Sequence, residues 1–125
     1  MILIKNGYIY TMAGQIIENG SILIDGDKIV EVGKDIVAPL DAEVIDAGGR
    51  MVLPGFIDGH SHLGMWEEGM GFEGSDGNEM VDPVTPHLRA IDAINPMDEG
   101  FKDAYKAGVT TVVTGPGSAN VIGGL

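Results

Sequence analysis

Residues 52–62 of the chain are VLPGFIDGHSH, and this stretch decides how the rest of the sequence folds. It contains a Pro-Gly break at 54–55, followed by a short apolar strand that ends in His60 and His62. Residues two apart on a strand project to the same side, about 6.6 Å from each other. Two imidazoles placed in this way can bind one metal ion at about 2.0–2.1 Å each. The stretch therefore predicts a metal-binding strand end, against the alternative of two solvated histidines.

The residues before this stretch predict a small β unit, which we place at residues 1–52. One hairpin is expected around Asn6-Gly7, between strands 2–5 and 8–10. A second is expected around 25–27, between strands 21–24 and 28–32, and a further short strand covers 43–46. These strands are rich in β-branched residues and have two distinct faces, which favours a small sheet or half-sandwich.

The residues after the stretch predict a long loop, a helix and a second strand. Residues 64–84 contain five glycines and little periodicity, so they form an irregular loop of the kind that is usually functional. A helix is expected from an N-cap at Asn95 to a left-handed cap at Gly108. Residues 109–113 then form a buried parallel strand. Strand, helix and strand make a βαβ unit, and ligands gather at the carboxyl ends of such strands, where the two histidines lie.

Composition narrows the possible functions. The 125 residues include 19 acidic and 7 basic side chains, and the net charge of −12 argues against nucleic-acid binding and against docking on an anionic membrane. The absence of cysteine leaves histidine and carboxylate chemistry. No stretch approaches the roughly 20 apolar residues of a membrane span. The first residues do not form a signal peptide, so we expect a cytoplasmic protein.

Three segments resemble the amidohydrolase superfamily of metal-dependent hydrolases, and most closely its branch related to imidazolonepropionase. Residues 52–62 resemble the first barrel strand, 45–49 the lead-in from a small N-terminal sandwich, and 107–113 the second barrel strand. The loop 71–87 fits this branch better than dihydroorotase, urease or deacetylase relatives. The resemblance implies an α/β fold in which a small β-sandwich precedes a TIM-type (β/α)8 barrel. Residues 53–125 would then be the start of the barrel, with its first two strands.

The resemblance also implies roles for individual residues. His60 and His62 match the family's first two metal ligands, and Asp58 is expected to orient an imidazole from outside the ligand set. An alternative for Asp58 is a strand-end carboxylate bonded to nearby backbone N–H groups. Glu67 and Glu68 are weaker candidates for the substrate pocket, because a solvated loop explains them better. Zinc is the expected metal, with iron, manganese and nickel left open.

The implied activity is hydrolysis of a carbon–nitrogen bond in a non-peptide or peptide-like amide, including cyclic amides, by a metal-activated water. A complete barrel needs about 200–250 residues, so we expect the chain to be the N-terminal third of an enzyme and inactive alone. No catalytic residue is assigned within it. The expected partners are a small-molecule amide substrate, the remainder of the barrel or another chain, and further copies of the protein in a homo-oligomer.

Two other classes of function stay open. One is a non-catalytic, β-rich docking module whose open sheet edges pair with another chain. The other is an acidic calcium-binding loop, although the EF-hand spacing is absent. Its ligands would come from Glu73, Asp76, Glu79 and Asp82. Calcium-dependent stabilisation that survives removal of His60 and His62 would favour this last alternative.

Overall fold

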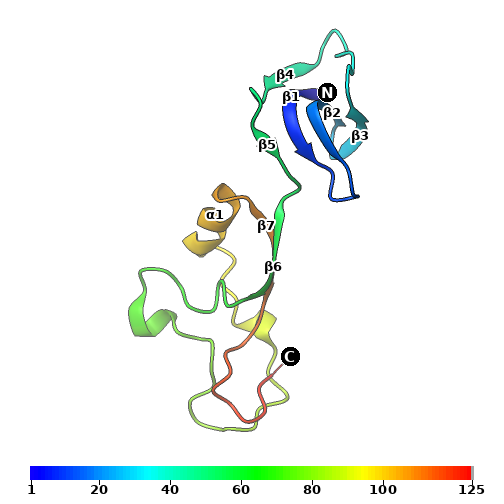
Figure 1. Cartoon of the computed structure of the whole chain (residues 1–125). Coiled ribbons are helices and arrows are strands. Elements are labelled where there is room, and N and C mark those ends of the chain that lie inside the picture. Colours follow the sequence, from blue (N-terminus) through cyan, green and yellow to red (C-terminus); the bar gives the residue numbers. More distant parts are fainter. Residues whose placement is uncertain (125) are drawn as a thin grey trace. The chain divides into compact units, whose positions relative to one another are not determined.

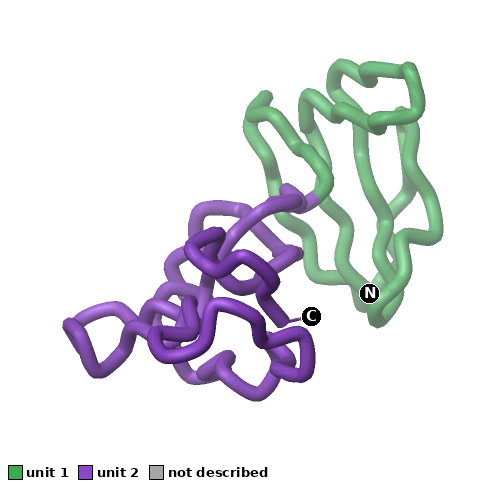
Figure 2. The backbone as a smooth tube through the Cα atoms, turned by 90° about the horizontal axis from the view of Figure 1, so that it is seen from below, with its two compact units in different colours: residues 1–54 green, residues 55–125 purple. Residues whose placement is uncertain are grey.

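The computed structural model describes residues 1–124 and divides the chain into two compact units (Figure 2). The N-terminal unit is residues 1–54, and the C-terminal unit starts at Gly55. The sequence-based boundary was placed after residue 52. In the described part of the chain, no helix has the length and apolar character needed to cross a membrane.

The N-terminal unit is a five-stranded sheet (Figure 1). Its strands are β1 (Ile2–Tyr10), β2 (Ile16–Asp25), β3 (Lys28–Gly33), β4 (Glu43–Asp46) and β5 (Met51–Val52). The order is β3-β2-β1-β4, and β5 also pairs with β1. Neighbours β1, β2 and β3 are antiparallel, whereas β4 and β5 run parallel to β1. The unit's buried apolar core consists of Leu3, Ile9, Ile22, Leu23 and Ala47. Residues 1–54 contain no second sheet, so the sandwich stays a prediction.

The hairpin predicted around Asn6-Gly7 is wrong, because β1 continues through these residues as one strand. Asn6 has a left-handed φ of 55°, which asparagine tolerates, and the register against β2 shifts at Gly7. Such a shift is a β-bulge. Gly7 is buried, and a side chain there would meet Val52 and Ile9, so its small size serves close packing. The second hairpin is confirmed: Asp25 pairs with Lys28 across a tight turn.

The C-terminal unit contains the predicted βαβ arrangement. Strand β6 (Phe56–Ser61) pairs in parallel with β7 (Val109–Thr114), and helix α1 (Glu99–Lys106) lies beside β7 (Figure 1). The long irregular loop is confirmed, with the short 3-10 helices η1 (Gly71–Gly74) and η2 (Ala90–Asp92) between β6 and α1. The expected burial of β7 is not met in the described residues, because β6 is its only described neighbour and Val113 stays exposed.

The helix α1 begins at Glu99, so the predicted N-cap at Asn95 is wrong. Asp98 is the N-cap, and its buried carboxylate accepts the N–H of Gly100 at 3.2 Å. The same carboxylate accepts the N–H of Gly64 at 3.1 Å and that of Glu68 at 3.2 Å. Because these two amides belong to the loop after β6, Asp98 ties that loop to the start of the helix. The hydrogen bonds from these loop amides thus explain why Asp98, and not Asn95, is the N-cap of α1.

Two opposing effects act on the Asp98 carboxyl group. Burial raises the pKa of Asp98, but the backbone N–H donors of Glu68, Gly100 and Gly64 outweigh burial and hold the pKa below its ordinary value. A pKa that is lower in the folded than in the unfolded state means that the ionised group stabilises the fold above the ordinary aspartate pKa. That contribution disappears as the pH falls through the folded-state pKa.

We predict that Asp98→Asn lowers the free energy of unfolding at neutral pH by about 1–3 kcal/mol, because the neutral amide has a single acceptor oxygen and loses the charge-assisted hydrogen bonds from the three backbone amides. Urea unfolding of the variant should also depend less on pH than that of the wild type between neutral pH and about pH 3, close to the ordinary aspartate pKa. Asp92→Asn is the control, because Asp92 forms an exposed ion pair with Arg89 at 2.7 Å and should change stability little. If the free energy of unfolding fell equally with decreasing pH in the wild type and in Asp98→Asn, the prediction would be contradicted.

A second prediction concerns packing in the N-terminal unit. A methyl group at Gly20 would lie 2.6 Å from Cδ1 of Ile9 and 2.9 Å from Cγ2 of Ile17, and Ile9 is part of the buried core. Gly20→Ala should therefore destabilise the protein by about 1–3 kcal/mol through overpacking. Gly33→Ala is the matched control, since its methyl meets nothing within 4 Å. Equal urea midpoints for the two variants would show that the core repacks without cost.

Candidate metal centre

The two histidines of the motif lie at the carboxyl end of β6. Strand β6 ends at Ser61, which pairs with Thr114, the last residue of β7. His62 and Gly115 are therefore the first residues beyond two parallel strands, at one edge of the pair. This is the edge at which parallel α/β folds bind their ligands.

The two imidazole rings lie side by side. Their centroids are 5.3 Å apart, and the ring planes meet at 77°. Two imidazoles that each bind one tetrahedral zinc ion through a nitrogen at about 2.0–2.1 Å have centroids roughly 5 Å apart. The spacing of His60 and His62 therefore fits a shared metal ion.

A hydrogen bond determines which nitrogen of His62 is available to a metal. Nδ1 of His62 lies 2.7 Å from the carbonyl oxygen of Gly115. A carbonyl oxygen only accepts, so Nδ1 carries the proton and donates it, leaving Nε2 as a lone-pair donor. Metal-binding histidines usually have such a partner on the second nitrogen. The hydrogen bond thus favours, for the neutral imidazole of His62, the tautomer that metal ligation requires.

Asp58 contacts the backbone next to the histidine pair. Its Oδ1 accepts the backbone N–H of His60 at 3.1 Å. Within the described residues this is the hydrogen bond that the Asp58 side chain makes, and it does not involve an imidazole nitrogen. The geometry corresponds to the alternative of a strand-end carboxylate bonded to nearby backbone. Through this bond Asp58 can affect the backbone conformation at His60, but it does not contact the imidazole.

Glu67 and Glu68 occupy the loop after the histidines. The half-buried Glu67 carboxylate accepts a hydrogen bond from the Asn95 side-chain amide. Glu68 is exposed, and its backbone N–H is the one bonded to Asp98. The structure thus brings both residues to the junction of the loop with the start of α1, without placing either against the histidine rings.

The other acidic residues of the loop do not gather into a cation site. Among residues 1–124, no three His, Cys, Asp or Glu side chains come together as a possible metal-binding group. The carboxylates considered for calcium therefore form no cage in this part of the chain. The third histidine, His87, is exposed. The candidate centre in the described residues therefore consists of the His60 and His62 pair alone.

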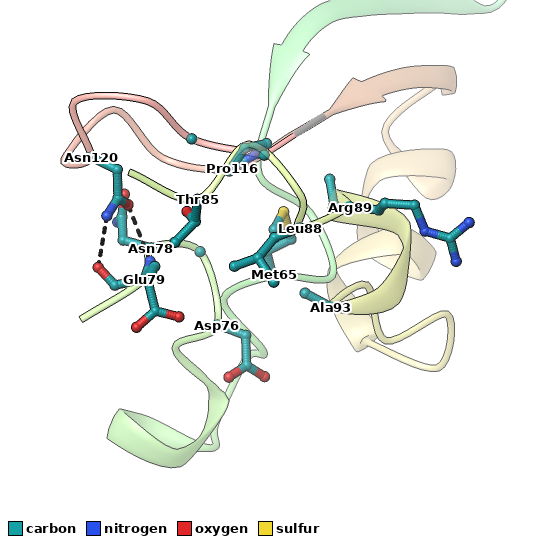
Figure 3. Close-up of a pocket in the computed structure, with 14 residues that line it drawn as sticks. Met65, Asp76, Asn78, Glu79, Thr85, Leu88, Arg89, Ala93, Pro116 and Asn120 are labelled. Carbon is teal, nitrogen blue, oxygen red and sulfur yellow. Dashed lines mark hydrogen bonds between the residues drawn. The ribbon is translucent and has the colours of Figure 1, made fainter. Parts of the chain in front are cut away.

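A separate pocket of about 70 Å³ lies between the loop after β6 and the segment after β7 (Figure 3). Its lining includes Met65, Thr85, Leu88, Ala93 and Pro116. The Asn120 side chain joins the two walls: its amide donates to the carbonyl of Glu79 at 2.9 Å and accepts the N–H of Glu79 at 3.1 Å. Neither His60 nor His62 lines this pocket, so it is distinct from the candidate metal centre.

Sequence reasoning missed the groups that hold His62. The sequence predicts no partner for His62, yet the carbonyl of Gly115 bonds its imidazole. Trp66 also contacts His62, with ring centroids 4.8 Å apart and an interplanar angle of 67°. The parallel pairing of 56–61 with 109–114 is the signal that would have placed residue 115 beside His62. No sequence signal indicated the contact with Trp66.

Comparison with known proteins relates these features to one family. Residues 43–79 match the family model described as the Amidohydrolase family. Amidohydrolase tasK of Hapsidospora irregularis is 38% identical over 109 residues, which are 84% of this chain and 11% of the relative. An imidazolonepropionase of Streptomyces griseus is 50% identical over 48 residues, which are 38% of this chain and 12% of the relative. The crystal structure of an amidohydrolase from Thermotoga maritima is 44% identical with a TM-score of 0.88, covering 99% of this chain and 32% of that one.

The chain spans between 11% and 32% of the length of these three relatives. Deaminases and dihydroorotases match as well, so the branch related to imidazolonepropionase stays a prediction. The matched region contains the strand with the two histidines, and the structural likeness extends over nearly the whole chain. On this evidence, the chain belongs to the amidohydrolase superfamily.

Proposed function

We propose that the whole protein is a metal-dependent hydrolase of carbon–nitrogen bonds in small amides, non-peptide or peptide-like and including cyclic amides. The observation that carries the proposal is the pair of imidazoles at the carboxyl end of β6, with centroids 5.3 Å apart. The family membership of the chain supports it, because its relatives include proteins named as amidohydrolases and deaminases.

His60 and His62 are the proposed ligands of one divalent ion. Zinc is the first choice, because imidazole nitrogens in a tetrahedral arrangement suit it, and iron, manganese and nickel are also compatible with imidazole ligands. When bound, such an ion would polarise a carbonyl group and lower the pKa of a bound water to about 7.

The residues of this chain prepare the two ligands. His62 donates its Nδ1 proton to the Gly115 carbonyl, which holds the ring and increases the basicity of Nε2. Asp58 accepts the backbone N–H of His60, and we assign it a positioning role at the end of β6. Neither contact uses Nε2 of His62 or a ring nitrogen of His60, so these nitrogens stay available to a metal.

The loop after β6 supplies the proposed substrate side of the site. Residues 51–88 contain seven acidic side chains and no Lys or Arg, and such a surface attracts a cation or the positive end of a zwitterion. Glu67 and Glu68 are the first acidic residues after the histidines in the sequence, and we place them at the edge of the substrate pocket. Self-association of the protein stays a prediction.

The combined substitution of His60 and His62 by alanine tests the proposal in the whole protein. We expect the variant to lose bound transition metal, measured by elemental analysis of the purified protein, and to lose amide hydrolysis with it. His87→Ala is the matched control, because this exposed histidine is outside the pair and its removal should leave the metal content unchanged. Full metal stoichiometry in the double variant would overturn the assignment.

A further inference from the structure

We propose that Trp66 is a positioning residue for His62: its indole keeps the imidazole in the orientation that a metal ligand needs. The inference rests on the proposed function, because it takes His62 to be a ligand. Its starting point is the edge-on contact between the two rings, with centroids 4.8 Å apart and planes at 67°. Tilted aromatic pairs at such distances attract each other through the ring quadrupoles.

The backbone around Trp66 is fixed on both sides. Trp66 forms an antiparallel bridge with Ser75. The N–H of Glu67 donates to the Gly74 carbonyl at 2.8 Å, and the N–H of Asp76 donates to the Met65 carbonyl at 2.8 Å. These bonds close the loop at its base. The indole is therefore carried on an ordered ladder within the irregular loop, so it can act as a fixed wall.

The absence of a side chain at residue 77 gives the indole its place. A Cβ atom added to Gly77 would overlap Cη2, Cζ2 and Cζ3 of Trp66, so the six-membered ring lies directly against the glycine backbone. Gly77 is itself held, because its carbonyl accepts the N–H of Gly117 at 2.7 Å. Gly117 belongs to the segment after β7. The support for the indole is thus anchored to the same segment that supplies the Gly115 carbonyl.

The two contacts on His62 restrict different motions of its ring. The hydrogen bond to Gly115 holds Nδ1 but permits the ring to pivot about the N–H···O direction. The contact with the indole limits this rotation of the imidazole, so the lone pair of Nε2 points in one fixed direction. For His60, the ring contact found among the described residues is with His62 alone. His62 is therefore the ligand whose direction the protein determines in advance, and Trp66 contributes to it.

Binding of Co²⁺ to the whole protein, followed by its visible absorption bands, tests this role without relying on activity. We expect Trp66→Ala to weaken Co²⁺ affinity by about 10–100-fold, as for loss of other groups that orient metal ligands, and to alter the absorption bands. Trp66→Phe keeps an aromatic wall and should recover most of the affinity. Circular dichroism of each variant checks whether it is folded.

Gly77→Ala displaces the indole while retaining it, so it should weaken Co²⁺ affinity in the same direction as Trp66→Ala. Gly123→Ala is the matched control, since its added methyl meets only Cγ of Pro116 at 3.9 Å. The emission of Trp66, obtained as the difference between wild type and Trp66→Phe, should be quenched by Co²⁺ in the wild type and less so in Gly77→Ala.

The outcomes separate this proposal from the proposed function. If His62→Ala loses Co²⁺ while Trp66→Ala and Gly77→Ala bind it as the wild type does, the role of Trp66 is overturned and the metal site stands. If His62→Ala retains full Co²⁺ stoichiometry, the proposed function fails. Should Trp66→Ala not fold, Gly77→Ala decides: affinity equal to that of Gly123→Ala contradicts the positioning role.

Discussion

The hydrogen bond from His62 to the Gly115 carbonyl is the interaction on which the site depends. It spans 2.7 Å between residues 53 positions apart in the chain, and it joins the first residue beyond β6 to the first residue beyond β7. The parallel pairing of the two strands brings these groups together. Because Nδ1 donates its N–H to this carbonyl, Nε2 is the nitrogen of His62 that is left for a metal. A single contact thus links the fold to the chemistry of the ligand.

The loop after β6 is kept in place mainly by hydrogen bonds between side chains and backbone groups, and less by apolar packing. Asp98 bonds the amides of Gly64 and Glu68, and Thr114 donates its hydroxyl to the Leu63 carbonyl at 2.9 Å. Met65 is the one fully buried large side chain among the described residues, at 2% exposure. Most large apolar side chains of the loop stay exposed, among them Phe72, Met80 and Val81, so polar contacts to α1 and to the end of β7 order it.

Much of the fold followed from local sequence signals. The turn at 25–27, the short strand 43–46 and the left-handed Gly108 each depend on a few neighbouring residues, and the structure contains all three. Two of the predictions were wrong because a tertiary contact outweighed a local sequence signal. Asn6-Gly7 and Asn95 carry strong local signals for a turn and a cap, but burial of Gly7 against Val52 and the loop amides at Asp98 overrule them.

The sequence by itself determined the His-x-His spacing, the strand that carries it and the order of strand, loop, helix and strand, because these are encoded within a few residues of each other. Only the tertiary structure decided which groups hold His62, and that Asp58 bonds backbone instead of a ring. These contacts require β6 to pair with β7 and the loop to fold back on itself. Hydrogen-bond partners tens of residues apart are chosen by that pairing, and no local pattern specifies them.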